Sequence, residues 1–314
     1  MPRIVEKLQK YRAIFLLAPA GWGKTTLIFE LFQRNKLNIL FISPLKALEK
    51  EVEEKALFFE KEEYFFKSLT AERVNKFLDT LSKKERQNLL VIFDEIHLWN
   101  FWGNRFRHRL WECFYQIAND GYPILALSAT LRDEYEIEWE SLFKQGGYDF
   151  QILDFGNGMT QNPPSVEISF YGLQRSLFLR RMIYELEKGE NCIVFCQYRE
   201  EVKRISQKIE GLGLIVKTCV GGESLKFMDD CRLGGFPSVI VCTSTLSHGV
   251  NLGDIKKVFI TYDVKDWDLF LQMMARGGRK GGGFELFSHR KEKASLWNKL
   301  KTKLFDRYLQ LFYA

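Results

Sequence analysis

The chain reads AIFLLAPAGWGKTTLIFELF from Ala13 to Phe32. Its first part, Ala13–Ala18, is an apolar run that predicts a buried strand, and Thr25–Phe32 has the pattern of a helix. The glycine-containing stretch Pro19–Gly23 between them predicts a tight loop. When a strand, a loop and a helix follow in this order, backbone N–H groups and the helix N-terminus converge on one point. The stretch therefore predicts an α/β fold with a phosphate-binding loop.

Strand-like and helix-like segments continue to alternate through the first half of the chain. Strands are predicted at Asn38–Ile42, Leu89–Phe93 and Ile124–Leu127, and a helix at Leu45–Phe58. This alternation is typical of a parallel sheet with crossover helices. The stretch GNGMTQNPPS at 156–165 then interrupts every periodicity, so we expect a linker at 157–165.

The alternation begins again after the linker. Strands are predicted at Val166–Tyr171, Cys192–Cys196, Leu214–Thr218, Val239–Cys242 and Val258–Tyr262. Because the chain has 314 residues and 46% hydrophobic content, it can form two cores of roughly 150 residues each. We therefore expect two α/β domains with parallel sheets, at 1–156 and 166–290, and a C-terminal helix at 291–314 that packs against one of them.

Composition limits the partners and the compartment. The 46 basic and 40 acidic residues give a net charge of +6, which suits a polyanion partner and equally suits an ordinary solvated surface. The longest apolar runs are strand-sized and the N-terminus is not signal-like, so we expect a cytoplasmic protein without a membrane segment.

The six cysteines contain no Cys-x-x-Cys pair. The closest two, Cys192 and Cys196, lie on one predicted strand and would be about 13 Å apart. That separation is too large for a shared zinc ion, whose Zn–S bonds are about 2.3 Å. We expect buried, reduced thiols and no zinc.

The phosphate loop suggests roles for the residues around it. Lys24 would neutralise charge on the β- and γ-phosphates, and the Thr25 hydroxyl would reach Mg²⁺. Ala18 stands where the general Gly-x₄-Gly-Lys-Thr pattern has its first glycine. The residues expected to bind the nucleotide are Ala20, Gly21, Trp22, Gly23, Lys24, Thr25 and Thr26.

An acidic pair, Asp94 and Glu95, follows the predicted strand Leu89–Phe93. The pair would lie at the carboxyl edge of the sheet, where open α/β sheets bind ligands. Asp94 would hold Mg²⁺ through water, and Glu95 would orient and deprotonate the attacking water. The alternative is an acidic helix cap with no catalytic role.

Four segments together carry a family resemblance. They are the phosphate loop at 18–25, Asp-Glu-Ile-His at 94–97, Ser-Ala-Thr at 128–130 and QMMARGGR at 272–279. Their order resembles that of superfamily 2 helicases of the DExH type, over roughly residues 12 to 283. The resemblance implies two tandem RecA-like lobes that bind ATP and Mg²⁺ in the cleft between them.

The resemblance also assigns roles to residues far from the phosphate loop. Arg276 and Arg279 would be arginine fingers and Gln272 would orient water or phosphate, whereas a basic surface turn is the alternative. Position 275 is alanine where the family has glycine. The catalytic set so implied is Lys24, Asp94, Glu95, Gln272, Arg276 and Arg279. Three residues, His97, Ser128 and Thr130, would couple hydrolysis to movement.

Other stretches resemble nucleic-acid-binding motifs of the same superfamily. LWNFWGNRFR at 98–107 resembles the aromatic-rich loop of RecQ-like DNA helicases, which would stack on bases, although these aromatics could instead be core residues. TSTLSHGVNL at 243–252 is similar to motif V of Ski-like and Hel-type helicases. The implied nucleic-acid contacts are Pro44, Lys46, Thr70, Arg73, Trp99, Trp102, Arg105, Phe106, Arg107, Tyr198, Arg199, Gly221, Thr243, Thr245 and Gly249.

The motifs predict an ATP-dependent helicase or translocase, and the RecQ-like resemblance implies that it acts 3′-to-5′ on single-stranded or tailed duplex DNA. The alternatives are an RNA helicase, a translocase that remodels complexes without unwinding, and a regulatory nucleotide switch. The family's adenine-reading glutamine has little room before Lys24, so selectivity for ATP is open. There is also no room for a long strand-separating hairpin before 272–279, so we expect either weak strand separation or a protein partner that supplies an unwinding element.

Overall fold

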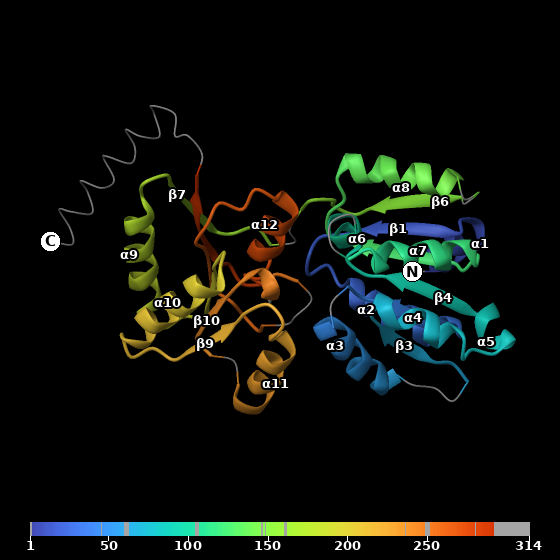
Figure 1. Ribbon diagram of the computed structural model, residues 1–314, viewed down its shortest axis with the longest axis horizontal. Coiled ribbons are helices and arrows are strands. Elements are labelled where there is room, and N and C mark those ends of the chain that lie inside the picture. Colours follow the sequence, from blue (N-terminus) through green and yellow to red (C-terminus); the bar gives the residue numbers. More distant parts are fainter. Residues whose placement is uncertain are drawn as a thin grey trace. The chain divides into compact units, whose positions relative to one another are not determined.

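The computed structural model describes residues 2–291 except 45, 60–62, 104–106, 146, 148, 160–161, 236, 249–251 and 280. The described residues form two compact units, 2–159 and 162–291 (Figure 1). Three predicted site residues, Arg105, Phe106 and Gly249, lie outside the described residues, as does the predicted C-terminal helix beyond Lys291.

The first unit is built on a six-stranded sheet in which every strand pairing is parallel. Its strand order is β3-β2-β4-β5-β1-β6. The strands are β1 (Ala13–Leu17), β2 (Asn38–Ile42), β3 (Phe66–Leu69), β4 (Leu89–Phe93), β5 (Ile124–Ser128) and β6 (Phe150–Asp154). The four inner strands are buried along their whole length, as expected of a parallel sheet with helices on both faces.

Alternate residues of the first sheet face two different layers of helices. Phe15 and Leu40 belong to a core with α4, α6, α7 and α8, whereas Ile14 and Phe41 belong to a core with α1, α2 and α3. The helices are α1 (Pro2–Lys10), α2 (Lys24–Asn35), α3 (Lys46–Ala56), α4 (Ala71–Leu78), α5 (Lys83–Gln87), α6 (Ile96–Gly103), α7 (Arg109–Asn119) and α8 (Asp133–Gln145), with a 3₁₀ turn, η1, at Leu57–Phe59.

The second unit is built on another six-stranded parallel sheet, in the order β7-β12-β11-β8-β10-β9. The strands are β7 (Val166–Tyr171), β8 (Cys192–Phe195), β9 (Val216–Cys219), β10 (Val239–Cys242), β11 (Lys257–Ile260) and β12 (Glu285–Arg290). The helices are α9 (Arg175–Leu186), α10 (Arg199–Glu210), α11 (Ser224–Gly234) and α12 (Trp267–Met274), with a 3₁₀ turn, η2, at Ser244–Leu246. Apolar residues of α9 and α10 share one core with this sheet.

The predicted fold class, two parallel sheets with flanking helices, is confirmed. Sequence reasoning missed three strands, β3, β6 and β12, and placed β9 about two residues too early. The six cysteines are buried and free, as predicted. Within the described part of the chain, no helix has the length and apolar character needed to span a bilayer.

The predicted linker is bonded to both units at its described ends. The Asn157 side chain accepts from the Leu131 N–H and donates to the Leu131 carbonyl, each at 2.7 Å. The Ser165 hydroxyl donates to the Phe284 carbonyl at 2.8 Å. The exact limits of the two domains remain a prediction.

Candidate functional site

The carboxyl edge of the first sheet collects the predicted phosphate and acid residues. Strands β1, β5 and β4 are consecutive neighbours in the sheet, so the segments that follow them meet at one edge. Ala18 and Asp94 directly follow β1 and β4, and Ser128 is the last residue of β5. The Ala18 N–H donates to the Ser128 carbonyl at 3.0 Å, which extends the pairing of β1 with β5 into the phosphate loop.

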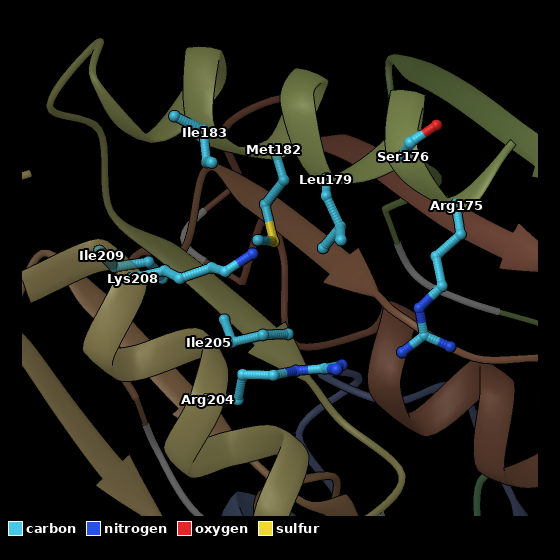
Figure 2. Close-up of a pocket in the computed structure, with 9 residues that line it drawn as sticks. All are labelled: Arg175, Ser176, Leu179, Met182, Ile183, Arg204, Ile205, Lys208 and Ile209. Atoms are coloured by element: carbon cyan, nitrogen blue, oxygen red, sulfur yellow. The ribbon is translucent and has the colours of Figure 1, made fainter. Parts of the chain in front are cut away.

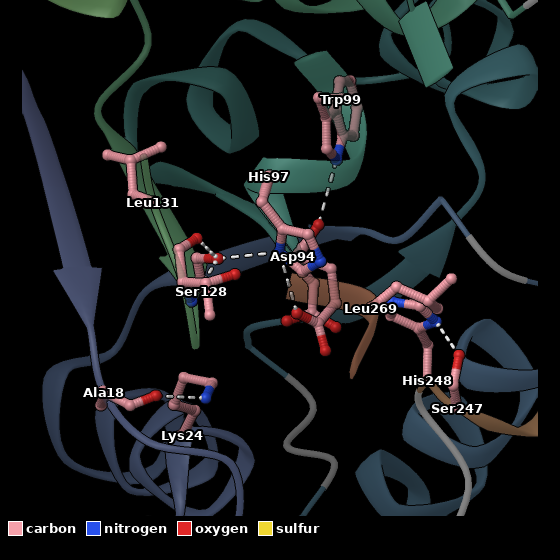
Figure 3. Close-up of polar contacts among 12 residues, drawn as sticks. Ala18, Lys24, Asp94, His97, Trp99, Ser128, Leu131, Ser247, His248 and Leu269 are labelled. Carbon is pink, nitrogen blue, oxygen red and sulfur yellow. Dashed lines mark hydrogen bonds and ion pairs between the residues drawn. The ribbon is translucent and has the colours of Figure 1, made fainter. Parts of the chain in front are cut away.

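The phosphate loop has the backbone geometry that its glycines predict. Gly21 and Gly23 have φ values of 85° and 101°, in the left-handed region that L side chains rarely adopt. Gly23 directly precedes α2, so the N–H groups of the first turn of that helix face the loop. The Lys24 ammonium donates to the Ala18 carbonyl at 2.7 Å (Figure 3) and to the Pro19 carbonyl at 3.3 Å. The predicted nucleotide-binding residues 20–26 thus form one loop and the first turn of α2.

The acidic pair is buried beside this loop. Asp94 and Glu95 are 8% and 9% exposed. Burial, followed by the neighbouring Glu95 carboxylate, raises the pKa of Asp94 to about 8, and the charge of Lys24 opposes this rise. Glu95 has a φ of 47°, which for a non-glycine residue is backbone strain of the kind found at functional sites. Within the described residues, Glu95 Oε2 is buried without a hydrogen-bond partner.

These residues fit a bound Mg²⁺ ion. Mg²⁺ prefers hard oxygen ligands, and the Asp94 carboxylate and the Thr25 hydroxyl are ligands of that kind. The pKa of Asp94 is raised by burial and by the neighbouring Glu95, so a nearby cation would favour the ionised form of Asp94. Asp94 and Thr25 would therefore hold the ion, and Glu95 Oε2 would remain for a water molecule.

The three predicted coupling residues form one bonded group. His97 Nδ1 lies 2.8 Å from Ser128 Oγ (Figure 3), and the Ser128 hydroxyl donates to the Thr130 carbonyl at 2.5 Å. Because the serine has only one hydroxyl proton, His97 must donate to it through Nδ1–H. The same nitrogen lies 3.5 Å from Glu95 Oε2. The group therefore joins the end of β5 to the acidic pair.

The predicted base contact of Trp99 is wrong. Its side chain is fully buried in the core of the first unit, with its ring centroid 4.7 Å from that of Phe93. Its indole N–H donates to the Asp94 carbonyl at 3.0 Å (Figure 3). Trp99 is buried because α6 begins directly after the acidic pair and its direction places the Trp99 side chain against the sheet. Trp102 is half-buried and packs against the same core.

Arg107 connects two segments that were predicted to contact nucleic acid. Its Nε donates to Glu72 at 2.8 Å, and its guanidinium also donates to the Pro44 carbonyl. Burial would raise the pKa of Glu72, but hydrogen bonds from its own backbone N–H and from Arg107 outweigh that effect and lower it. Arg107 therefore ties the segment after β2 to the start of α4.

The predicted contacts of the first unit gather at the carboxyl ends of β2 and β3. Pro44 is buried and Lys46 is exposed, both directly after β2. Thr70 follows β3 and is 1% exposed, and the exposed Arg73 forms an ion pair with Glu49 at 2.6 Å. Lys46, Arg73 and Arg107 thus lie at this edge, with Arg73 and Arg107 paired with Glu49 and Glu72.

The predicted contacts of the second unit gather in the same way, after β8, β9 and β10. Arg199 donates to the Gly221 carbonyl at 2.7 Å, and the hydroxyls of Thr243 and Thr245 lie 3.1 Å apart. Tyr198 is 62% exposed next to them. Three separate motifs of the sequence therefore meet at one edge of the second sheet.

The two predicted arginine fingers have different surroundings. Arg276 is 1% exposed, and its Nε and one terminal nitrogen donate to the Ser247 carbonyl at 3.1 and 2.7 Å. Arg279 is half-buried and its Nε donates to the Ala275 carbonyl at 3.1 Å. Gln272 is 3% exposed on α12. Ala275 has φ −68° and ψ 7°, so no glycine is needed there.

Several partners that hold the site together escaped the sequence reasoning. They include Glu72, which binds Arg107, and Asn157, which brackets Leu131 after the Ser-Ala-Thr segment. The signal for Glu72 was its position two residues after Thr70, because a carboxylate among residues predicted to bind nucleic acid can pair with one of their basic side chains. Ser247 carried no such signal, because it holds Arg276 through a backbone carbonyl.

Comparisons with known proteins agree with this arrangement. Residues 174–281, within the second unit, match the helicase conserved C-terminal domain. No curated protein matches the chain.

Several solved helicase structures share the whole fold. S. cerevisiae Dbp5 bound to RNA and ADP BeF3 is 15% identical with a TM-score of 0.69, covering 96% of this chain and 83% of Dbp5. The Mycobacterium smegmatis helicase Lhr bound to ssDNA and AMP-PNP is 18% identical with a TM-score of 0.66, covering 91% and 44%. The DUF1998 helicase MrfA bound to DNA is 15% identical with a TM-score of 0.71, covering 96% and 50%. At these identities the likeness defines the fold, which is the tandem RecA-like fold.

Proposed function

We propose that this protein is an ATP-dependent nucleic-acid motor that couples hydrolysis of ATP with Mg²⁺ to 3′-to-5′ movement along DNA. The observation that carries the proposal is the carboxyl edge of the first sheet, where the phosphate loop with Lys24 after β1 and the buried pair Asp94 and Glu95 after β4 come together (Figure 3). The helicase C-terminal domain at 174–281 supports a motor over a simple nucleotide switch.

Hydrolysis follows from the roles these side chains can fill. Lys24 leaves the Ala18 and Pro19 carbonyls and binds the β- and γ-phosphates, which the N–H groups of the loop also hold. Mg²⁺, when bound, neutralises charge that develops on the phosphates. Glu95 accepts a proton from the attacking water through Oε2, and His97 Nδ1 lies 3.5 Å from that oxygen.

DNA is the proposed track, because the aromatic-rich segment at 98–107 resembles that of RecQ-like helicases and two of the fold's neighbours, Lhr and MrfA, are bound to DNA. Because Trp99 is buried, Trp102 is the aromatic residue of this segment that could stack on a base, among those whose side chains the structure describes. The alternative track is RNA, which Dbp5 binds. A motor that remodels complexes without unwinding is the other alternative.

ATP hydrolysis by the purified chain tests the proposal. It is measured without nucleic acid, with single-stranded DNA and with single-stranded RNA. Glu95→Gln serves as the blank, and Glu112→Gln on the exposed face of α7 is the matched control. We expect DNA to stimulate hydrolysis, Glu95→Gln to lower it by roughly 10² to 10⁴ and Glu112→Gln to leave it unchanged.

The other outcomes separate the alternatives. Stimulation by RNA alone would move the track to RNA, and hydrolysis indifferent to both polymers would contradict the motor. Tailed duplexes then distinguish a helicase, which releases a strand, from a remodelling translocase, which does not. Opposite tails on the duplex report the direction of movement.

A further inference from the structure

A groove with an apolar floor lies between α9 and α10 of the second unit, with a volume of about 330 Å³. Figure 2 shows Leu179 and Met182 from α9 and Ile205 from α10 directed into the space between the two helices. Ile183 and Ile209 complete the aliphatic lining. Met182, Ile205 and Ile209 are buried, whereas Leu179 and Ile183 stay half-exposed in the groove. Such a floor can accept one or two apolar anchor side chains.

The rim of the groove is basic. Arg175, Arg204 and Lys208 are exposed and line it. Arg175 is paired with Glu201 at 2.6 Å, but no acidic side chain of the described residues forms an ion pair with Arg204 or Lys208. Arg175 and Arg204 also line a second cavity of about 260 Å³, together with Tyr198, Glu200 and Glu201. Within the groove itself, an apolar floor beside Arg204 and Lys208 favours an occupant with apolar anchors and negative charge.

We propose that this groove docks an acidic, amphipathic helix of a partner protein. Its apolar face would fill the floor, as in helix-in-groove recognition, and its carboxylates would meet Arg204 and Lys208. The chain's own segment 292–314 has the wrong charge, because it contains five basic and two acidic residues. Nucleic acid suits the cations, but the aliphatic floor offers no aromatic ring for a base to stack on.

The groove is separate from the nucleic-acid residues of the same unit, although α10 joins them. Arg199, at the start of α10, bonds to Gly221, whereas Ile209 in the groove lies ten residues later, roughly 15 Å along the helix. A docked partner would therefore contact the helix that carries Arg199 while leaving Arg199 itself accessible.

Peptide display on the full chain tests the proposal, because it selects ligands for the groove directly. Random peptides long enough for four helical turns are selected on the wild-type chain after depletion on the Ile183→Glu/Arg204→Glu double variant. An enriched peptide is then titrated by fluorescence anisotropy against each single variant and against Lys203→Glu. Lys203 is exposed on α10 outside the groove, so its variant makes the same charge change as a control. Circular dichroism and thermal melting check that each variant is folded.

We expect groove-dependent peptides that combine helically spaced apolar residues with Asp or Glu. Ile183→Glu and Arg204→Glu should each weaken binding by roughly tenfold or more, and Lys203→Glu by less than about twofold. Failure to enrich such peptides, enrichment of basic peptides, or equal binding by the variants would overturn the proposal. Competition by a synthetic 292–314 peptide would identify the chain's own segment as the occupant, and competition by single-stranded DNA or RNA would identify nucleic acid. Either result would also overturn it.

Discussion

At the scale of single residues, Arg276 and Arg279 belong to one motif but differ in burial and in hydrogen-bond partners. Arg276 is enclosed by its own unit and satisfied by the Ser247 carbonyl, so its guanidinium supports the turn that carries Arg279. Arg279 is half-buried and is therefore the better candidate for a contact with phosphate. A burial difference of this kind is invisible in QMMARGGR, because both positions are the same residue type.

Gly277 is the residue on which the shape of this turn depends. A Cβ atom placed there would lie 2.2 Å from Cδ2 and 2.4 Å from Cγ of Phe284, which is 1% exposed and has no room to move. We predict that Gly277→Ala lowers the free energy of unfolding by about 1–3 kcal/mol, the usual cost of overpacking. Thermal or urea unfolding of the full chain measures the loss.

Gly283→Ala is the matched control for Gly277→Ala. It lies in the same loop, has no positive φ and would place its Cβ at an ordinary 3.4 Å from Ser165 Oγ. The control should unfold within about 0.5 kcal/mol of the wild type. Equal stability of both variants would contradict the close approach of Gly277 to Phe284.

Residues with a local signature were predictable, and residues with a tertiary role were not. Asp94 and Glu95 were assigned because they stand at the end of an apolar strand run, and Lys24 because it follows a glycine-containing loop after such a run. These runs locate the edge of the sheet. Trp99 was assigned to the wrong environment because an aromatic-rich segment looks the same whether its rings meet bases or a core. Only the direction of α6 decides between the two, and that direction is set by packing against the sheet.

At the scale of elements, the strands buried on both faces were predictable, and the three strands that were missed have mixed composition or partial exposure. β1 and β4 are continuous apolar runs, whereas β3 contains Lys67 and Ser68, and β12 contains Glu285, Ser288 and His289. β6 is an edge strand with half-exposed residues. A strand of mixed composition gains much of its stability from its neighbours in the sheet, so its local pattern is a weaker signal.

A charged cluster fixes α9 to β11 in the second unit. Glu185 on α9 is fully buried and meets Lys257 of β11 at 2.5 Å and Arg181 at 2.7 Å. Lys257 is 2% exposed and also pairs with Glu190 at 2.8 Å. Burial would raise the pKa of Glu185, but hydrogen bonds from Lys188 and Lys257 and the charges of Lys257 and Arg181 outweigh it and lower the pKa.

We predict that Glu185→Gln lowers the free energy of unfolding at pH 7 by on the order of 3–5 kcal/mol, because it leaves Lys257 buried with only Glu190 opposite. A carboxylate with a lowered pKa contributes stability above its unfolded value of 4.5 and loses it as pH falls through the folded value. The difference from wild type should therefore shrink below about pH 4.5, as measured by urea unfolding between acid and neutral pH.

The exposed Glu187 next to α9 supplies the control for this pH series. Glu187→Gln makes the same chemical change at the same end of the helix without touching Lys257, and should alter stability by less than about 0.5 kcal/mol at any pH. A destabilisation by Glu185→Gln that stays constant down to acid pH would mean that its charge is not what stabilises the unit.

At the scale of the whole molecule, the two units repeat one design. Each is a six-stranded parallel sheet whose carboxyl edge carries the residues with predicted roles. The first edge holds the phosphate loop and the acidic pair. The second unit holds Arg276, Arg279 and the group formed by Arg199, Gly221, Thr243 and Thr245. A motor needs hydrolysis to depend on both units, because otherwise neither unit would respond to the nucleotide bound by the other.

We predict that Arg279→Ala lowers the turnover of ATP by roughly 10³-fold or more, although it lies in the second unit, because an arginine that reaches the γ-phosphate stabilises charge in the transition state. Affinity for a fluorescent ATP analogue should change by only a few-fold, since in our proposal Lys24 and the loop bind the phosphates. Arg232→Ala on α11 removes an equally charged side chain, paired with Asp229 at 3.5 Å, and should keep full turnover. Arg279→Ala is chosen over Arg276→Ala because removing the buried Arg276 side chain would also remove the two hydrogen bonds that it donates to the Ser247 carbonyl. Full turnover in Arg279→Ala would mean that the first unit hydrolyses ATP without this arginine, and the proposed dependence on Arg279 would then fail.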